Sequence, residues 1–238
     1  GVILIEDNKP DAVALMEEKV KPYDNIRVVA AKTQYPEGAE KMLIKKVMGR
    51  QVPSGKLPAD VGCVVSNTST AKAISDAIQQ GMPLEERVVS VTGEFIRNPG
   101  NYIVKLGTNV QEIIDHCGGV TGDDVVLKMG GPMMGAPIKD TNVPIIKGSN
   151  GIIAIAADHT EEKECIKCGR CMDVCPMELA PLDIYKYAQL GDAETLLKLN
   201  VMDCFSCKCC EYICSSKIPL VSKINAAKGL VMPLLKKK

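Results

Sequence analysis

The sequence lacks tryptophan and is poor in other aromatic residues, with two phenylalanines and six tyrosines among 238 residues. It also lacks a charge bias, because 29 basic side chains balance 29 acidic ones, so it gives no indication of a nucleic-acid-binding surface. Its longest apolar run, GIIAIAA from Gly151, falls far short of the roughly 20 residues needed to cross a bilayer. Any work at a membrane would therefore require something else to hold the protein there.

Histidine is also scarce, whereas cysteine is plentiful. The two histidines, His116 and His159, lie in no ligand pattern, and we expect them to be ordinary surface or core side chains. The 11 cysteines are an odd number, no secretory signal leads the chain, and most of them are too close together for a disulfide framework. This usage favours a reducing compartment and a bound metal.

The first part of the chain alternates between strand-like and helix-like segments, which favours a mostly parallel sheet covered by helices. The expected strands are VILIE, IRVVAA, VGCVV and RVVSV, and the expected helices are PDAVALMEEKV, EKMLIKKVMG and TAKAISDAIQQG, the last with Thr70 as its cap. Because domains rarely start inside their core, we expect strands and loops of the whole protein to precede Gly1.

Two polar loops follow expected strands, at residues 6–9 and 66–70. Ligands of open parallel sheets bind beyond the carboxyl ends of strands, where helix N-termini and free backbone N–H groups gather. These loops are therefore candidate ligand contacts, although ordinary turn and cap residues would show the same pattern.

The remaining chain changes character twice. From Thr92 the pattern is β-rich, with an NPG turn, one helix at VQEIIDH, and a glycine–methionine turn at 129–135 that is no P-loop. From about Asp158 it is helical and rich in cysteine. We therefore expect three domains, at 1–85, 86–157 and 158–238.

Eight of the cysteines form two copies of one motif. CIKCGRCMDVCP has the spacing C-x2-C-x2-C-x3-C-P, and CFSCKCCEYICS repeats it with Ser215 in place of proline. Three cysteines on one tight turn can hold three irons of a cubane cluster, while the fourth points to the other cluster. The expected ligand sets are Cys165, Cys168, Cys171 and Cys214 for one [4Fe–4S] cluster, and Cys204, Cys207, Cys210 and Cys175 for the other.

Zinc is the competing metal, but zinc ribbons use separated C-x2-C pairs and need no third cysteine at the same interval. Iron–sulfur is therefore the preferred interpretation. Cys209 breaks the spacing and is expected to point away as a spare thiol, whereas Cys63, in a strand, and Cys117, at a helix end, are expected to be small buried hydrophobes. Two neighbouring cubanes indicate single-electron transfer.

The segments IEDNKPDA, NTSTAKAI, RVVSVTGEFIRNPGNY, MGGPMMG and the two cysteine motifs together resemble the C subunit of the Rnf-type electron-transport complex, over essentially the whole chain. That family is similar to the flavin subunit of respiratory complex I. The resemblance implies a Rossmann-like α/β flavin domain, a β-grasp domain of the SLBB type, and a helical two-cluster, ferredoxin-like domain.

The resemblance also implies a function and a flavin site. FMN would receive hydride from NADH, and the clusters would pass electrons to partner subunits of an ion-translocating NADH:ferredoxin oxidoreductase on the cytoplasmic face of the bacterial cell membrane. By position, Glu6, Asp7, Asn8 and Lys9 match one wall of the flavin site, and Asn67 and Thr68 match a second.

The chain departs from the family pattern in three places. The glycine-rich flavin and nucleotide loop is expected before Gly1, Ser215 replaces a usual proline, and Lys208 stands where glycine is common. Two alternatives stay open: a soluble flavin and iron–sulfur reductase that serves a corrinoid or amino-acid reductase system, and a zinc-stabilised binding module.

Overall fold

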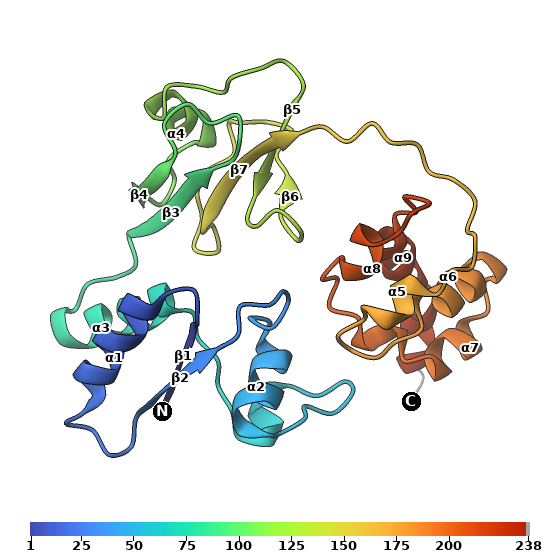
Figure 1. The fold of residues 1–238 in the computed structure, drawn as a ribbon, viewed down its shortest axis with the longest axis horizontal. Helices are drawn as coiled ribbons and strands as arrows, with labels where there is room; N and C mark the ends of the chain where they lie inside the picture. Colours follow the sequence, from blue (N-terminus) through green and yellow to red (C-terminus); the bar gives the residue numbers. More distant parts are fainter. Residues whose placement is uncertain (237–238) are drawn as a thin grey trace. The chain divides into compact units, whose positions relative to one another are not determined.

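The computed structural model describes residues 1–236 and divides the chain into two compact units, the first of which is Gly1–Val65. This unit contains β1 (Val2–Glu6), α1 (Pro10–Val20), β2 (Arg27–Ala31), α2 (Glu40–Met48) and a 3₁₀ helix (Pro58–Val61). Strands β1 and β2 are parallel, with Val2 paired to Arg27 and Glu6 to Ala31. A parallel pair needs a crossover connection, which α1 supplies (Figure 1).

The strand expected at VGCVV is absent, and that prediction was wrong. Pro58 starts a 3₁₀ turn there, and Gly62 leaves it in the left-handed region at φ +68°. The Arg50 guanidinium donates to the Val61 carbonyl at 2.8 Å, so a side chain takes an acceptor that a ladder would use. Val64 is 89% exposed, which no buried strand would allow.

The second unit begins at Ser66 with helix α3 (Thr68–Gln80). The Asn67 side chain accepts a hydrogen bond from the Ser69 backbone N–H at 3.0 Å and so caps this helix. The expectation that Thr70 is the cap was therefore wrong, because the helix starts earlier and Thr70 lies inside its first turn.

A five-stranded mixed sheet follows in the order β4-β3-β7-β5-β6. Its elements are β3 (Glu86–Thr92), β4 (Gly100–Lys105), α4 (Val110–His116), β5 (Val125–Met129), β6 (Ala136–Pro137) and β7 (Gly151–Ala156). β3 pairs antiparallel with β4 and parallel with β7, so RVVSV belongs to this sheet and not to that of β1 and β2.

Alternating side chains of this sheet form a core with α4. Val89, Val91, Ile152 and Ala154 are fully buried and pack with residues of α4. Gly93 is required at the end of β3, since a Cβ there would lie 2.0 Å from the Ala154 carbonyl oxygen. The β-rich region with one helix, expected from the sequence, is confirmed by these elements and by the core that they share.

The last part of the chain is helical (Figure 1). It comprises α5 (Arg170–Asp173), α6 (Pro181–Leu190), α7 (Ala193–Lys198), a 3₁₀ helix (Val201–Asp203), α8 (Cys209–Tyr212) and α9 (Leu220–Leu235). Ile184 of α6, Leu196 of α7 and Ile224 of α9 are buried together in one core. The expected helix VSKINAAKGLV is confirmed but longer, because α9 continues through Pro233.

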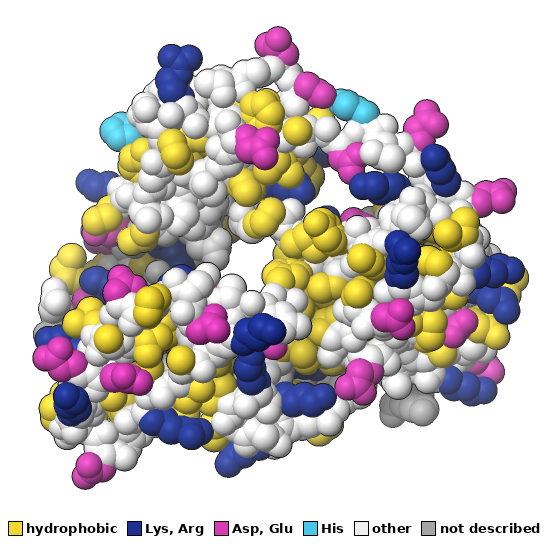
Figure 2. Space-filling model, in the orientation of Figure 1, with side chains coloured by type: hydrophobic (Ala, Val, Ile, Leu, Met, Phe, Trp, Pro, Cys, Tyr) yellow, Lys and Arg dark blue, Asp and Glu magenta, His cyan; other side chains and the backbone are white. Residues whose placement is uncertain are grey.

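The molecular surface carries charges of both signs, interspersed over the face shown in Figure 2. This agrees with the formal net charge of zero. Among residues 1–236, the apolar stretches of the helices are too short for any of them to cross a membrane.

Candidate functional site

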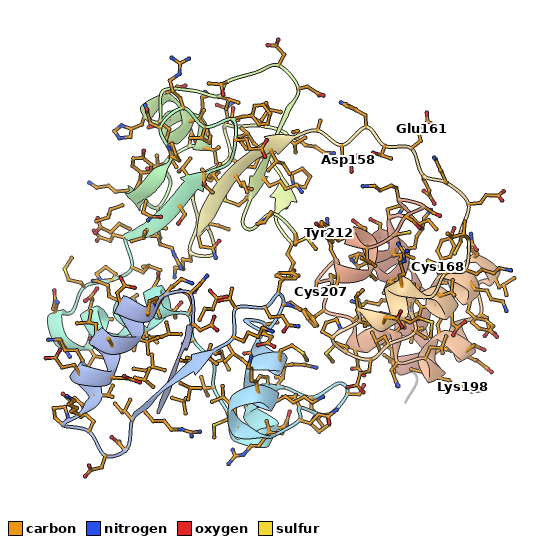
Figure 3. The ribbon with its side chains drawn as sticks, in the orientation of Figure 1. Asp158, Glu161, Cys168, Lys198, Cys207 and Tyr212 are labelled. Atoms are coloured by element: carbon orange, nitrogen blue, oxygen red, sulfur yellow. The ribbon has the colours of Figure 1, made fainter. Side chains whose placement is uncertain are left out.

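The eight motif cysteines line two small cavities in the helical region. One cavity is lined by Cys165, Cys168, Cys171 and Cys214, and the other by Cys175, Cys204, Cys207 and Cys210. Each cavity thus takes three cysteines from one motif and the last cysteine of the other. The grouping is the crossed one expected from the spacing, and the role of these sulfurs as iron ligands stays a prediction. Figure 3 marks one cysteine of each motif, Cys168 and Cys207.

Apolar side chains complete both cavities. Leu182, Tyr185 and Ile218 line the first, and Phe205, Val221 and Ile224 line the second. In residues 1–236 no three His, Cys, Asp or Glu side chains converge closely enough to hold a single metal ion. A zinc site places every sulfur about 2.3 Å from one point, whereas a cubane spreads its thiolates over four irons. Each cavity thus offers the four thiols that a [4Fe–4S] cubane takes as ligands.

Residues in the left-handed backbone conformation shape both motif loops. Lys167 and Gly169 have φ of 55° and 78° in the first motif, and Ser206 and Lys208 at the matching places of the second have φ of 61° and 66°. Such residues curl the chain tightly, so that successive cysteines return to the same cavity. Because a glycine adopts this conformation without strain, the geometry explains why glycine is common where Lys208 stands.

Burial differs among the cysteines, and it raises the pKa of three of the motif thiols. Cys168 is exposed, whereas Cys207 and Cys210 are buried. Burial raises the pKa of the Cys210 thiol to about 12 and also raises the pKa values of Cys171 and Cys175. These thiols therefore carry protons when no metal is bound, and binding iron as thiolates must release those protons.

The remaining cysteines lie outside the two cavities. Burial, together with a hydrogen bond to Cys207, raises the pKa of Cys209 to about 12, which keeps it an inert thiol beside the cluster motif. Cys117 is fully buried at the end of α4, as expected. Cys63 is only half-buried and lies in no strand, so its expected strand position was wrong.

The predicted first flavin wall, Glu6–Lys9, lies at the carboxyl end of β1 and opens α1. The Lys9 ammonium donates to Glu6 Oε2 at 2.5 Å and to Asn8 Oδ1 at 3.0 Å. Asp7, Asn8 and Lys9 are exposed. The loop therefore presents hydrogen-bond donors and acceptors at the carboxyl end of a strand, where ligands of parallel sheets bind. Such groups fit the predicted role as one wall of a flavin site.

Asp7 has a structural partner that the sequence analysis missed. Its Oδ1 accepts hydrogen bonds from the Thr33 backbone N–H at 2.9 Å and from the Thr33 hydroxyl at 2.8 Å. These bonds hold the pKa of Asp7 below its usual value, so the carboxylate stays charged as the pH falls until that lowered pKa is reached. Thr33 follows β2, and its place just after a strand was the signal available.

The predicted second wall, Asn67 and Thr68, starts helix α3 in the second unit. Asn67 Oδ1 is committed to the helix cap. The helix-capping role of Asn67 is thus a structural alternative to flavin contact. The sequence analysis left the same alternative open for both loops.

Both histidines and two α9 side chains make further contacts. His116 packs edge-on against Tyr102 with ring centroids 5.4 Å apart, and His159 Nε2 lies 2.7 Å from Asp124 Oδ2. Asn225 and Lys228 of α9 contact the second cysteine motif, at Ser206 and at the Cys204 carbonyl respectively. No motif signalled these two residues, but aligning the two halves on their cysteines would have shown where the helices differ.

Three family models match successive parts of the chain. A Nuo51 FMN-binding domain matches residues 1–76, an SLBB domain matches residues 88–137, and a 4Fe-4S dicluster domain matches residues 164–218. A crystal structure of an NAD⁺-reducing [NiFe]-hydrogenase has a similar fold, with a TM-score of 0.55 at 12% identity, covering 97% of this chain and 47% of the other. The expected flavin-domain, SLBB and two-cluster architecture is confirmed.

Several curated relatives are named as C subunits of ion-translocating oxidoreductase complexes. The C subunit of the ion-translocating oxidoreductase complex of Rhodobacter capsulatus is 43% identical over 231 residues, which is 95% of this chain and 44% of the relative. The C subunit of the Na⁺-translocating ferredoxin:NAD⁺ oxidoreductase complex of Acetobacterium woodii is 39% identical, over 96% of this chain and 52% of the relative. The proton-translocating counterpart of Clostridium ljungdahlii is 47% identical, over 74% of this chain and 39% of the relative.

The three matched domains define a class of flavin and iron–sulfur proteins, whose cofactors are the FMN and the [4Fe–4S] clusters expected from the sequence. Within that class, the chain belongs to the C-subunit family of Rnf-type ion-translocating oxidoreductase complexes. It spans about half the length of the curated relatives it matches, or less.

Proposed function

We propose that this chain is the electron-transfer portion of the C subunit in an ion-translocating NADH:ferredoxin oxidoreductase. Electrons would pass between NADH and FMN at one end and partner subunits at the other, through two [4Fe–4S] clusters. The observation that carries the proposal is the pair of cavities, each lined by three cysteines of one motif and the fourth of the other. The names of the relatives support the same activity.

Each group of residues has its own part in this function. Cys165, Cys168, Cys171 and Cys214 would hold one cluster, and Cys175, Cys204, Cys207 and Cys210 the other. The clusters supply one-electron carriers. The apolar side chains around the second cavity lower the access of water to its more buried sulfurs, Cys207 and Cys210. Glu6–Lys9 in the first unit, and separately Asn67 and Thr68 in the second, are the residues proposed to contact the flavin.

The proposed function also includes an assembly with partner subunits. Partner subunits would hold the chain at the cytoplasmic face of the bacterial cell membrane, and ferredoxin would exchange electrons with the complex as a whole. Two relatives are named as subunits of ion-translocating oxidoreductase complexes, which supports an assembly with partner subunits.

Metal analysis and EPR of the purified full-length complex test this function. We expect about eight irons in the subunit and cubane signals that appear with NADH and grow with dithionite. Zinc in place of iron would overturn electron transfer, whereas clusters reduced only by dithionite would remove NADH as the source.

A soluble reductase serving a corrinoid or amino-acid reductase system is the alternative. It predicts co-purification with a soluble partner, whereas the proposed function predicts co-purification with integral membrane subunits. The names of the relatives favour the second outcome.

A further inference from the structure

A cation lies against the backbone of the second cysteine motif. The Lys228 ammonium, on α9, donates a hydrogen bond to the Cys204 carbonyl oxygen at 2.6 Å, in a half-buried contact. Asn225, one turn earlier on the same helix, contacts Ser206 at 3.1 Å. Helix α9 therefore anchors the first loop of the second motif and brings a positive charge to it.

Within residues 1–236, the first motif has no matching hydrogen bond from a cation on its own helix. The two halves correspond position by position, since α5 and α6 match α8 and α9 and the left-handed residues recur at the same places. In this correspondence Lys228 matches Gln189 of α6. The Gln189 amide donates to the Tyr185 hydroxyl at 3.0 Å, so its neutral side chain is held on its own helix.

Other charges near the two cavities are more alike. Arg170 lines the first cavity and Lys208 the second. Lys208 is also 3.8 Å from Glu211, so part of its charge is balanced. Other matched positions also differ in charge, such as Glu178 and Lys217, but Lys228 differs from its match and also donates to the backbone of a proposed ligand cysteine.

Burial acts in the opposite direction. Cys207 and Cys210 of the second cavity are 9% and 7% exposed, whereas Cys168 of the first is an exposed residue. Adding an electron makes a thiolate-bound cluster more negative, and burial in a low dielectric disfavours that state. Without compensation, the more buried cluster would be the harder one to reduce.

We propose that Lys228 is a tuning residue that raises the reduction potential of the cluster assigned to Cys175, Cys204, Cys207 and Cys210, offsetting its burial. The inference rests on the proposed function. A half-buried cation close to a ligand's backbone stabilises the additional electron because charges interact more strongly away from bulk water. The consequence is a smaller difference in reduction potential between the two clusters than burial alone would give.

An EPR-monitored redox titration of the purified complex tests the proposal with Lys228→Gln, which copies the side chain found at Gln189. One of the two cluster transitions is expected to move to lower potential. At the wild-type midpoint, its ratio of reduced to oxidised cluster should fall about tenfold, equivalent to about 59 mV for one electron. Lys228→Arg, which keeps the charge, should restore the wild-type midpoint.

The reciprocal variant Gln189→Lys keeps the test possible if Lys228→Gln fails to fold. It should move the other transition to higher potential while the Lys228-dependent transition stays in place. Unchanged midpoints in both variants, at full iron content, would overturn the tuning role, as would equal shifts of both clusters in Lys228→Gln. Zinc in the wild-type complex would instead overturn the proposed function, so the two failures are distinguishable.

Discussion

At the residue scale, both cysteine motifs contain non-glycine residues in the left-handed backbone region, which is strained for residues with a β-carbon. Lys208 sits at φ +66°, where a β-carbon is strained, whereas the matching Gly169 sits at φ +78° without that cost. The ion pair of Lys208 with Glu211, at 3.8 Å and partly exposed, offsets little of this strain.

Replacing Lys208 by glycine should therefore stabilise the loop by up to about 1 kcal/mol. The temperature at which the visible absorbance of the clusters is lost should rise. Gly169→Ala is the matched control, and it should lower that temperature, because a Cβ there meets no atom within 4 Å and only backbone strain changes. The same direction of change in both variants would contradict this account.

Cys209 offers a second test at this scale. It lies between two motif cysteines but lines neither cavity. Cys209→Ser should leave iron content and both cluster midpoints unchanged, whereas Cys210→Ser should cost cluster iron. Iron loss from Cys209→Ser would show that this thiol, and not its neighbour, is the ligand.

At the scale of the element, the helix starts show what local sequence can and cannot reveal. The Pro10 start of α1 and the Gly49 end of α2 follow known helix preferences and were predictable. The cap of α3 was misplaced because Asn67, Thr68 and Thr70 are all good capping residues, and only the backbone geometry selects Asn67. The apolar run VGCVV has the pattern of a strand, but the Val61 carbonyl accepts a hydrogen bond from Arg50, 11 residues earlier, and the pattern does not reveal that contact.

The cap can be tested by substitution. Asn67→Ala should cost about 1 kcal/mol of local helix stability, because the Ser69 N–H loses its acceptor. Amide hydrogen exchange should show faster exchange across α3. Thr70→Ala, at the residue expected from sequence to be the cap, should change exchange much less, and an equal effect would reject the assignment of Asn67.

At the scale of the molecule, the spacing of the cysteines indicated a crossed pairing, and the two cavities group the thiols in that way. Equal spacing was sufficient to predict this grouping because the backbone follows the same path in both halves. Aligning the halves shows that Lys228 replaces Gln189, but its contact was not predictable, since Lys228 donates to a carbonyl 24 residues away and no spacing rule marks such a hydrogen bond.

Paired substitutions distinguish crossed from uncrossed ligation. Cys165→Ser with Cys214→Ser should remove about four of eight irons, because both sulfurs serve one cluster. Cys165→Ser with Cys175→Ser should damage both clusters, although these two residues belong to a single motif. Iron and sulfide analysis of the full-length protein measures the difference, and the reverse pattern would establish uncrossed ligation.

The exchange of a cysteine between the two motifs also constrains the order of biogenesis. With the proposed ligands, the first set is incomplete until translation has passed Cys214, and the second set requires Cys175 from the earlier motif. A ribosome-bound chain that ends between the motifs can complete neither set. Full ligation of either cluster therefore has to wait for both motifs, and each completed cluster cross-links two segments that were synthesised at different times.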